Sequence, residues 1–120
     1  MKTWIRRWGM AVLMMLAIFF ASSTPGSDLP QFGQWDLFAK KGGHLFGYAL
    51  LAVGYLRGLA NGKAVTKRHW ILAVIFASLY AASDEFHQHF VPGRNSSFND
   101  IIIDTVGAAL GAGLWTWVKL

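Results

Sequence analysis

The last twenty residues, Ile101–Leu120, read IIIDTVGAALGAGLWTWVKL and contain only two charged side chains, those of Asp104 and Lys119. A helix needs roughly 20 mostly apolar residues to cross a bilayer, so this stretch is long enough to be a transmembrane helix. The composition agrees, because 54% of the 120 residues are hydrophobic and 14% are charged, whereas soluble proteins have about 25% charged residues. We therefore predict an all-α membrane protein with a single domain, residues 1–120.

Three further apolar stretches begin near Trp8, Gly42 and Trp70. The third reaches spanning length only if Asp84 and Glu85 are tolerated inside a helix. The sequence thus predicts a four-helix transmembrane bundle, with helices at about residues 5–24, 42–59, 70–87 and 100–119.

Turn-forming residues separate these stretches. Ser22–Ala39 is rich in Pro and Gly and predicts a long loop, and Asn61–Lys63 and Val91–Asn95 predict shorter turns. Ser97–Asp100 resembles a capping box that opens the last helix. The first stretch also allows an alternative, because a basic start, an apolar run and the small residues Ala21–Ser23 are typical of a cleaved signal peptide. Cleavage would leave three helices.

The charges are distributed unequally between the two sides of the predicted bundle. With the N-terminus inside, the inner side carries eight basic residues and no acid: Lys2, Arg6, Arg7, Arg57, Lys63, Lys67, Arg68 and Lys119. The outer side carries Lys40, Lys41, Arg94 and all six acids: Asp28, Asp36, Asp84, Glu85, Asp100 and Asp104. Cytoplasmic loops carry an excess of Lys and Arg, which predicts that both termini are cytoplasmic. The net charge of +5 then reflects membrane orientation, and we predict no nucleic-acid partner.

Each of the last three predicted helices has one polar face, since a helix turns about 100° per residue. The faces comprise Lys41, His44, Tyr48 and Tyr55; Tyr80, Asp84 and Gln88; and Ser97, Asp100, Asp104, Gly107 and Gly111. A charge that faces lipid is costly, so these faces should turn towards each other and form a polar pocket that opens outward. Gly107 and Gly111 should let two helices approach closely. For Asp104, one turn deeper than Asp100, the candidate partners are Lys41, Arg94 and a protonated His44.

These motifs resemble those of the VanZ-like family of small bacterial membrane proteins, over roughly Ser22–Gly111. The matching residues are Lys41, His44 and Tyr48; Asp84, Glu85 and Gln88; Phe90, Pro92, Gly93 and Arg94; Ser97 and Asp100; and Gly107 and Gly111. The chain departs from the family pattern at Lys40, where an acid is usual, and at Asp104, where Asn is usual. The resemblance implies a multi-pass protein of the bacterial inner membrane with a link to glycopeptide antibiotics, since the namesake is associated with teicoplanin resistance. It does not supply a reaction.

The first functional hypothesis is a binding module for the headgroup of a membrane lipid or of a lipid-linked envelope precursor, with a glycopeptide as a further candidate partner. Lys41 and Arg94 would pair with phosphate or carboxylate, Arg94 by a bidentate fork. The predicted ligand-binding residues are Lys41, His44, Tyr48, Asp84, Glu85, Gln88, Arg94, Ser97, Asp100 and Asp104.

The alternative is a membrane-embedded enzyme that acts on a lipid-linked phosphate or another envelope substrate. The candidate catalytic residues are His44, as general acid or base, with Asp84 or Glu85 as its partner. A nucleophilic Asp or a metal held by Asp84, Glu85 and Asp100 belongs to this alternative, although we predict no cofactor and no metal. A third hypothesis is a structural subunit whose charges only stabilise the bundle.

Overall fold

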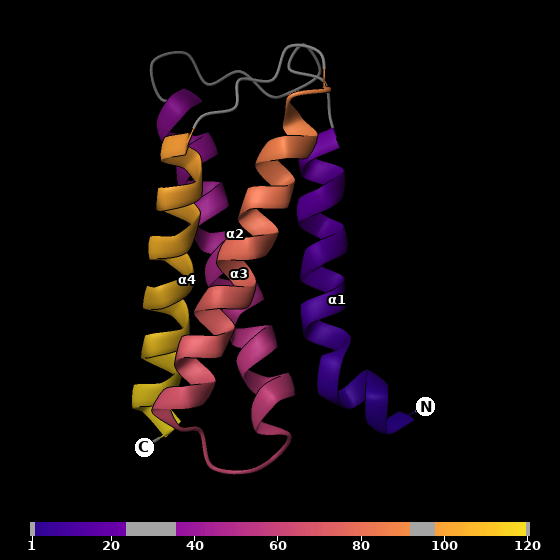
Figure 1. The fold of residues 1–120 in the computed structure, drawn as a ribbon, viewed down its shortest axis with the longest axis vertical. Coiled ribbons are helices and arrows are strands. Elements are labelled where there is room, and N and C mark those ends of the chain that lie inside the picture. Colours follow the sequence, from indigo (N-terminus) through magenta and orange to yellow (C-terminus); the bar gives the residue numbers. More distant parts are fainter. Residues whose placement is uncertain (1, 24–35, 92–97, 120) are drawn as a thin grey trace.

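The computed structural model describes residues 2–23, 36–91 and 98–119, and these ranges form four helices and no strand (Figure 1). The helices are α1 (Lys2–Ser23), α2 (Asp36–Ala60), α3 (Lys67–Gln88) and α4 (Phe98–Lys119). They lie side by side along the long axis of the molecule, with the N- and C-terminal ends of the chain at the same end of the bundle (Figure 1). The predicted all-α class is confirmed for the described residues.

One predicted boundary is wrong, because α2 begins at Asp36 and not near Gly42. The C-terminal part of the predicted loop Ser22–Ala39 is therefore helical. Hydropathy marks where a chain becomes apolar, whereas a helix continues through charged residues until a helix-breaking residue stops it. No Pro occurs between Pro30 and Pro92, and an acidic residue such as Asp36 is favourable in a first helical turn. Residues 24–35 of the predicted loop lie outside the described part of the chain, as does Ser97 of the predicted cap.

The connection between α2 and α3 is a tight turn, as predicted. Asn61 and Gly62 adopt positive φ angles of 51° and 82°, a conformation that Asn and Gly tolerate best. Thr66 then caps α3. Its hydroxyl accepts a hydrogen bond from the backbone N–H of His69 (3.3 Å), and His69 Nδ1 accepts one from the backbone N–H of Thr66 (3.1 Å). This reciprocal pair explains why α3 begins before Trp70.

Glycines set the distance between α2 and α4. A Cβ atom added to Gly107 would lie 2.5 Å from the carbonyl oxygen of Leu45, and one added to Gly111 would lie 2.5 Å from Ala49 Cβ. Neither position accepts a larger side chain without a shift of the helix backbones. The predicted role of these two glycines in helix packing is confirmed.

A second pair of glycines lies on the opposite side of α2 and was not identified in the sequence as a packing motif. A Cβ atom at Gly54 would lie 2.8 Å from the backbone nitrogen of Ala11, and one at Gly58 would overlap the ring of Trp8. Helix α2 thus packs closely on α1 as well as on α4. It also contacts α3, so it is in contact with all three other helices.

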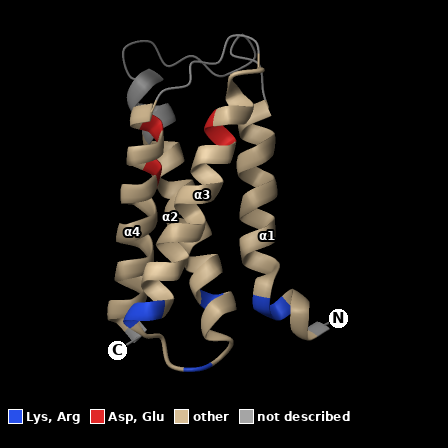
Figure 2. Cartoon of the chain, viewed as in Figure 1, with Lys and Arg blue, Asp and Glu red and all other residues tan. Residues whose placement is uncertain are grey.

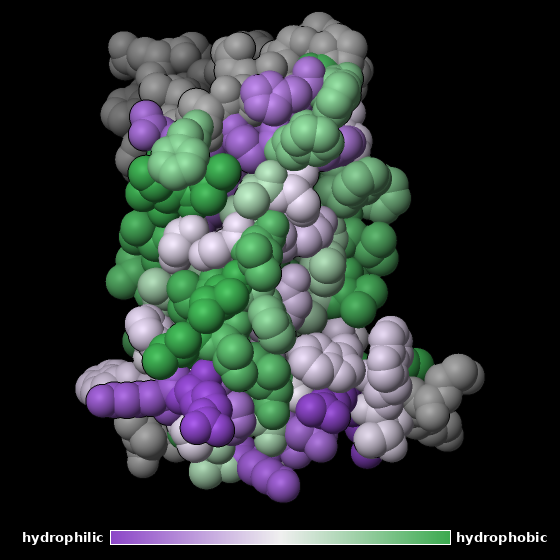
Figure 3. Space-filling model, viewed as in Figure 1, coloured by the Kyte–Doolittle hydropathy of each residue, from purple (hydrophilic) through white to green (hydrophobic). Residues whose placement is uncertain are grey.

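The face of the bundle seen in Figure 3 is mostly apolar along its middle. Large hydrophobic side chains are exposed on every helix, among them those of Leu13, Phe20, Phe46, Ile75, Leu79, Leu110 and Leu114. Within the described residues, two helical segments are long and apolar enough to cross a membrane, Thr3–Ser23 and Phe98–Val118. An apolar surface of this extent is unusual for a soluble monomer and is typical of an interaction with lipid or protein.

Substitution of Gly111 tests the packing of α2 on α4. Gly111→Ala is expected to lower the free energy of unfolding by about 1–3 kcal/mol, the range for overpacked interiors. The matched control is Gly43→Ala, because no atom lies within 4 Å of a Cβ added there and Ala is a better helix former than Gly. Thermal unfolding in detergent, followed by circular dichroism, compares the two variants. Equal stability of wild type and Gly111→Ala would show that α2 and α4 do not meet at this position.

Candidate functional site

The charged side chains gather at opposite ends of the bundle (Figure 2). One end carries the described basic residues of α1, α2, α3 and the α2–α3 turn: Arg6, Arg7, Arg57, Lys63, Lys67 and Arg68. The four described acids lie towards the other end, where α1 and α3 terminate and α4 begins: Asp84, Glu85, Asp100 and Asp104. The segregation predicted from the sequence is present in the structure, and the acidic end holds the candidate site.

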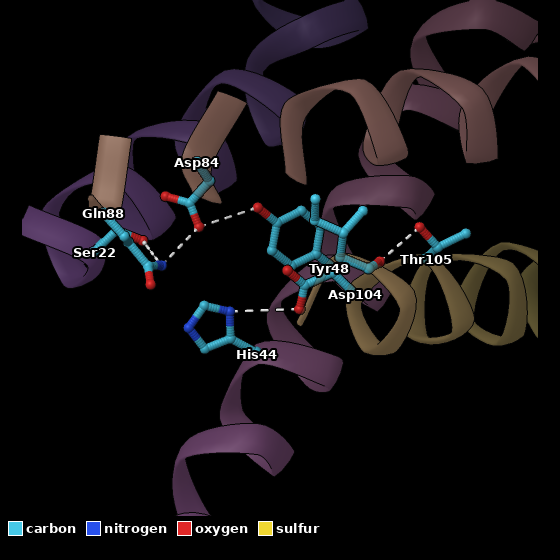
Figure 4. A network of polar contacts seen from close by, with 8 residues as sticks. Ser22, His44, Tyr48, Asp84, Gln88, Asp104 and Thr105 are labelled. Atoms are coloured by element: carbon cyan, nitrogen blue, oxygen red, sulfur yellow. Dashed lines mark hydrogen bonds and ion pairs between the residues drawn. The ribbon is translucent and has the colours of Figure 1, made fainter. Parts of the chain in front are cut away.

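Asp84 on α3 is the centre of a buried hydrogen-bond network (Figure 4). Its Oδ2 accepts a hydrogen bond from the Tyr48 hydroxyl on α2 (3.3 Å) and another from Gln88 Nε2 one turn along α3 (3.3 Å). Gln88 Nε2 also donates to Ser22 Oγ near the end of α1 (3.3 Å). All four side chains are buried. A buried carboxylate is costly unless it is hydrogen-bonded, and here two donors from two helices supply those bonds.

Asp104 on α4 lies beside His44 on α2, with His44 Nδ1 3.4 Å from Asp104 Oδ1 (Figure 4). Of its three predicted partners, His44 is therefore confirmed as a neighbour, whereas the Lys41 side chain and Arg94 lie outside the described part. Asp104 is buried, and the His44 side chain is 29% exposed. The pair is an ion pair when the imidazole is protonated. It joins one group inside the bundle to one that solvent reaches.

Asp84 and Asp104 belong to one site because α2 carries a partner of each, Tyr48 for Asp84 and His44 for Asp104. The rings of His44 and Tyr48 lie nearly parallel, with centroids 6.3 Å apart and an interplanar angle of 13°. Tyr80 continues this aromatic layer on α3, 6.3 Å from the Tyr48 ring, and its hydroxyl donates to the carbonyl oxygen of Met15 on α1 (2.6 Å). We define the polar cluster as Ser22, His44, Tyr48, Tyr80, Asp84, Gln88 and Asp104.

The remaining predicted site residues lie around the polar cluster. Glu85 is buried next to Asp84 in the sequence, and Asp100 is half-buried one turn before Asp104. For Lys41 the structure describes only its place in α2, and Arg94 and Ser97 lie outside the described residues. The polar faces of α2, α3 and α4 do turn towards each other, as helical periodicity predicted.

The alternative in which Asp84, Glu85 and Asp100 hold a metal is not supported by their arrangement. Within the described ranges, no three His, Asp or Glu side chains converge as metal ligands would. Asp84 instead directs one oxygen at Tyr48 and Gln88. Asp84 and Glu85 are consecutive residues of α3, and Asp100 lies on α4.

Sequence reasoning missed the contribution of α1. Ser22 was part of the small-residue motif of the signal-peptide alternative, yet its side chain is buried and bonded to Gln88. Ser23 Oγ lies 3.5 Å from His87 Nε2, and the His87 ring stacks on Phe19 at 4.7 Å. His87 is thus half-buried against α1. The sequence feature that could have indicated this contribution is the pair of hydroxyl side chains, Ser22 and Ser23, at the end of an apolar helix.

A family model described as VanZ/LLP1 matches residues 8–119. The chain belongs to the VanZ/LLP1 family. The match confirms the resemblance read from the motifs and covers all four helices, including most of α1. Comparison with curated proteins and with solved structures found no match. Membership of the VanZ/LLP1 family, together with the two apolar helices α1 and α4, indicates a membrane protein of this type.

Removal of one hydroxyl tests the network at Asp84. Tyr48→Phe is expected to destabilise the fold by about 1 kcal/mol, the scale of interhelical hydrogen bonds in membrane proteins, because Asp84 loses one of the two donors that the described residues supply. Tyr55→Phe is the matched control, since Tyr55 is also buried on α2 but its hydroxyl makes no hydrogen bond to the described residues. Thermal unfolding in detergent measures both. Equal effects of the two substitutions would contradict the bond to Asp84.

Proposed function

We propose that this VanZ/LLP1 family member crosses the bacterial inner membrane four times, with both termini in the cytoplasm and the polar cluster near the outer surface. Exposed apolar side chains on α2 and α3 as well as on α1 and α4 support four spans. The gathering of basic residues at the end that holds both termini supports the orientation. Helix α1 stays in the bundle in this proposal, because Ser22 completes the polar cluster.

Single cysteines test the orientation, and the chain offers a clean background because it contains no cysteine. Asn99→Cys, at an exposed position in the first turn of α4, should react with a membrane-impermeant maleimide on intact spheroplasts. Asn61→Cys, in the exposed α2–α3 turn, should react only after the membrane is permeabilised. The reverse pattern would invert the topology, and reaction of both cysteines from outside would exclude four spans.

The function that the geometry supports best is the binding of a polar headgroup, from a membrane lipid or a lipid-linked envelope precursor, at the outer side. The observation that carries this proposal is the burial of three carboxylates, Asp84, Glu85 and Asp104, within a bundle that exposes large apolar side chains. Ionisable groups at membrane depth are costly and mark functional pathways or sites. His44 is partly exposed and provides the point of access to the buried groups.

In this proposal the phosphate or carboxylate of the headgroup pairs with Lys41 and Arg94. The carboxylates and hydrogen-bonding groups of the polar cluster orient its hydroxyl or amine substituents. Charge-assisted hydrogen bonds from Arg to an anion are about twice as strong as those between neutral groups. Binding at this position would alter what the outer leaflet displays, and an effect on the response to glycopeptide antibiotics is one outcome consistent with it.

Native mass spectrometry of protein gently extracted from its own membrane tests the binding function. Wild type should retain a lipid or precursor, and Arg94→Ala should lose it because the anion loses its bidentate partner. Arg68→Ala is the control, since it removes the same charge at the opposite end of the bundle. A wild type that melts cooperatively but carries no ligand would contradict the proposal, as would equal loss from both variants.

One observation favours the enzymatic alternative, namely the pairing of His44 with Asp104. A carboxylate that orients an imidazole is a common arrangement for general acid–base catalysis. In the structure the carboxylate beside His44 belongs to Asp104, whereas the sequence hypothesis named Asp84 or Glu85. Turnover of a lipid-linked phosphate by the purified protein, abolished in His44→Gln and in Asp104→Asn, would establish this alternative. Ligand retention without turnover would leave the binding function.

A further inference from the structure

The basic end of the bundle contains a cavity of about 750 Å³. Four cationic residues line it, Arg6 and Arg7 from α1, Arg57 from α2 and Lys63 from the α2–α3 turn, and the aromatic side chain of Trp115 on α4 completes the wall. The cavity is thus formed by three helices and one turn that are far apart in the sequence. It lies at the opposite end of the bundle from the polar cluster.

Among the described residues, no side-chain carboxylate lies at this end of the bundle to balance these four cations (Figure 2). Every acidic residue lies at position 28 or 36, or between positions 84 and 104, and the described acids are at the other end of the bundle (Figure 2). The charges at the cavity repel each other and attract an anion from outside the chain. Lys and Arg concentrated in one concave site also raise the local concentration of anions.

Contacts within the protein hold part of this basic wall in place. Arg7 Nε donates a hydrogen bond to the carbonyl oxygen of Gly58 (2.6 Å), and the Arg7 guanidinium lies 5.1 Å from the centre of the Trp8 ring. Arg57 Nη1 lies 3.6 Å from the sulfur of Met10 on α1. These contacts hold Arg7 against α2 and Arg57 against α1, and both arginines line the cavity. Such pre-organisation reduces the cost of ordering the site when an anion binds.

The surroundings of the cavity identify the kind of anion. Trp4 and Trp117 are exposed near the two chain ends that flank it, and Trp residues favour the headgroup level of a bilayer. Exposed apolar side chains, such as Leu13 on α1, continue from this level towards the middle of the bundle. An occupant whose phosphate enters the cavity can therefore lay acyl chains along α1. Basic pockets on the cytoplasmic side of helix bundles suit acidic lipid headgroups in this way.

We propose that this cavity binds the phosphate-bearing headgroup of an anionic phospholipid. The assignment of that lipid to the cytoplasmic leaflet rests on the orientation proposed above, whereas the binding itself does not. The site is separate from the polar cluster, so the protein contacts one headgroup at its basic end independently of any ligand at its acidic end. Anionic lipid at this position also neutralises the repulsion among the four cations and stabilises the contact between α1 and α2.

The test uses the full chain, delipidated in a neutral detergent, with phosphatidylglycerol or phosphatidylcholine added in equal amounts. Native mass spectrometry should show phosphatidylglycerol bound in preference to phosphatidylcholine. Arg57→Gln and Lys63→Gln should each weaken its binding about fivefold, the factor that corresponds to one basic residue near an anionic surface. Arg7 is left unchanged, because its bond to Gly58 also supports helix packing.

Lys67→Gln is the matched control, since Lys67 lies at the same end but does not line the cavity, and it should bind phosphatidylglycerol as wild type does. Circular dichroism confirms that each variant is folded before its binding is compared. Equal binding of phosphatidylglycerol and phosphatidylcholine would overturn the proposal. So would a loss of phosphatidylglycerol binding in Lys67→Gln as large as that in Arg57→Gln and Lys63→Gln. Protection against thermal unfolding by inorganic phosphate, without retention of phosphatidylglycerol, would show a site for free phosphate and would overturn the lipid assignment. The cysteine-labelling experiment tests the orientation separately, so the two proposals can fail independently.

Discussion

The close approach of α2 and α4 determines the geometry of the rest of the bundle. Because Gly107 and Gly111 have no side chains, the backbone of α2 at Leu45 and Ala49 rests directly on α4. That contact places His44 beside Asp104. On the neighbouring face of α2, it leaves Tyr48 directed at Asp84 on α3. A wider separation of α2 from α4 would move His44 away from Asp104, so the packing of small residues and the burial of this charge depend on each other.

A buried carboxylate must be satisfied by hydrogen bonds, and this requirement explains why the polar cluster takes residues from all four helices. One helix cannot supply enough donors for a buried carboxylate, since its own backbone groups are already bonded to each other. Tyr48 and Gln88 provide two donors to Asp84, and Ser22 accepts a second bond from Gln88. The bond from Tyr48 to Asp84 and the bond from Gln88 to Ser22 also link helices that lipid alone would not hold together.

Much of this arrangement could be predicted from the sequence because it depends on helical periodicity. The four helices, the inward polar faces and the role of Gly107 and Gly111 all follow from counting residues along a helix. The start of α2 at Asp36 could not be predicted, since hydropathy does not respond to a charged helical extension. The role of Ser22 and the basic cavity were also missed. Both depend on how α1 lies against the other helices, which the pattern within a single helix does not contain.

Helix α2 has one segment, Leu51–Leu56, in which six consecutive residues are buried, so neighbours surround it on every side. A helix enclosed in this way cannot slide or tilt without breaking contacts with all three of its neighbours. Helix α1 is held differently, because it packs mainly on α2, touches α3 less and makes no contact with α4 among the described residues. The bundle therefore has one central helix, α2, and one peripheral helix, α1. Since that helix carries Ser22, its displacement would open one side of the polar cluster while breaking fewer helix contacts than displacement of α2 would.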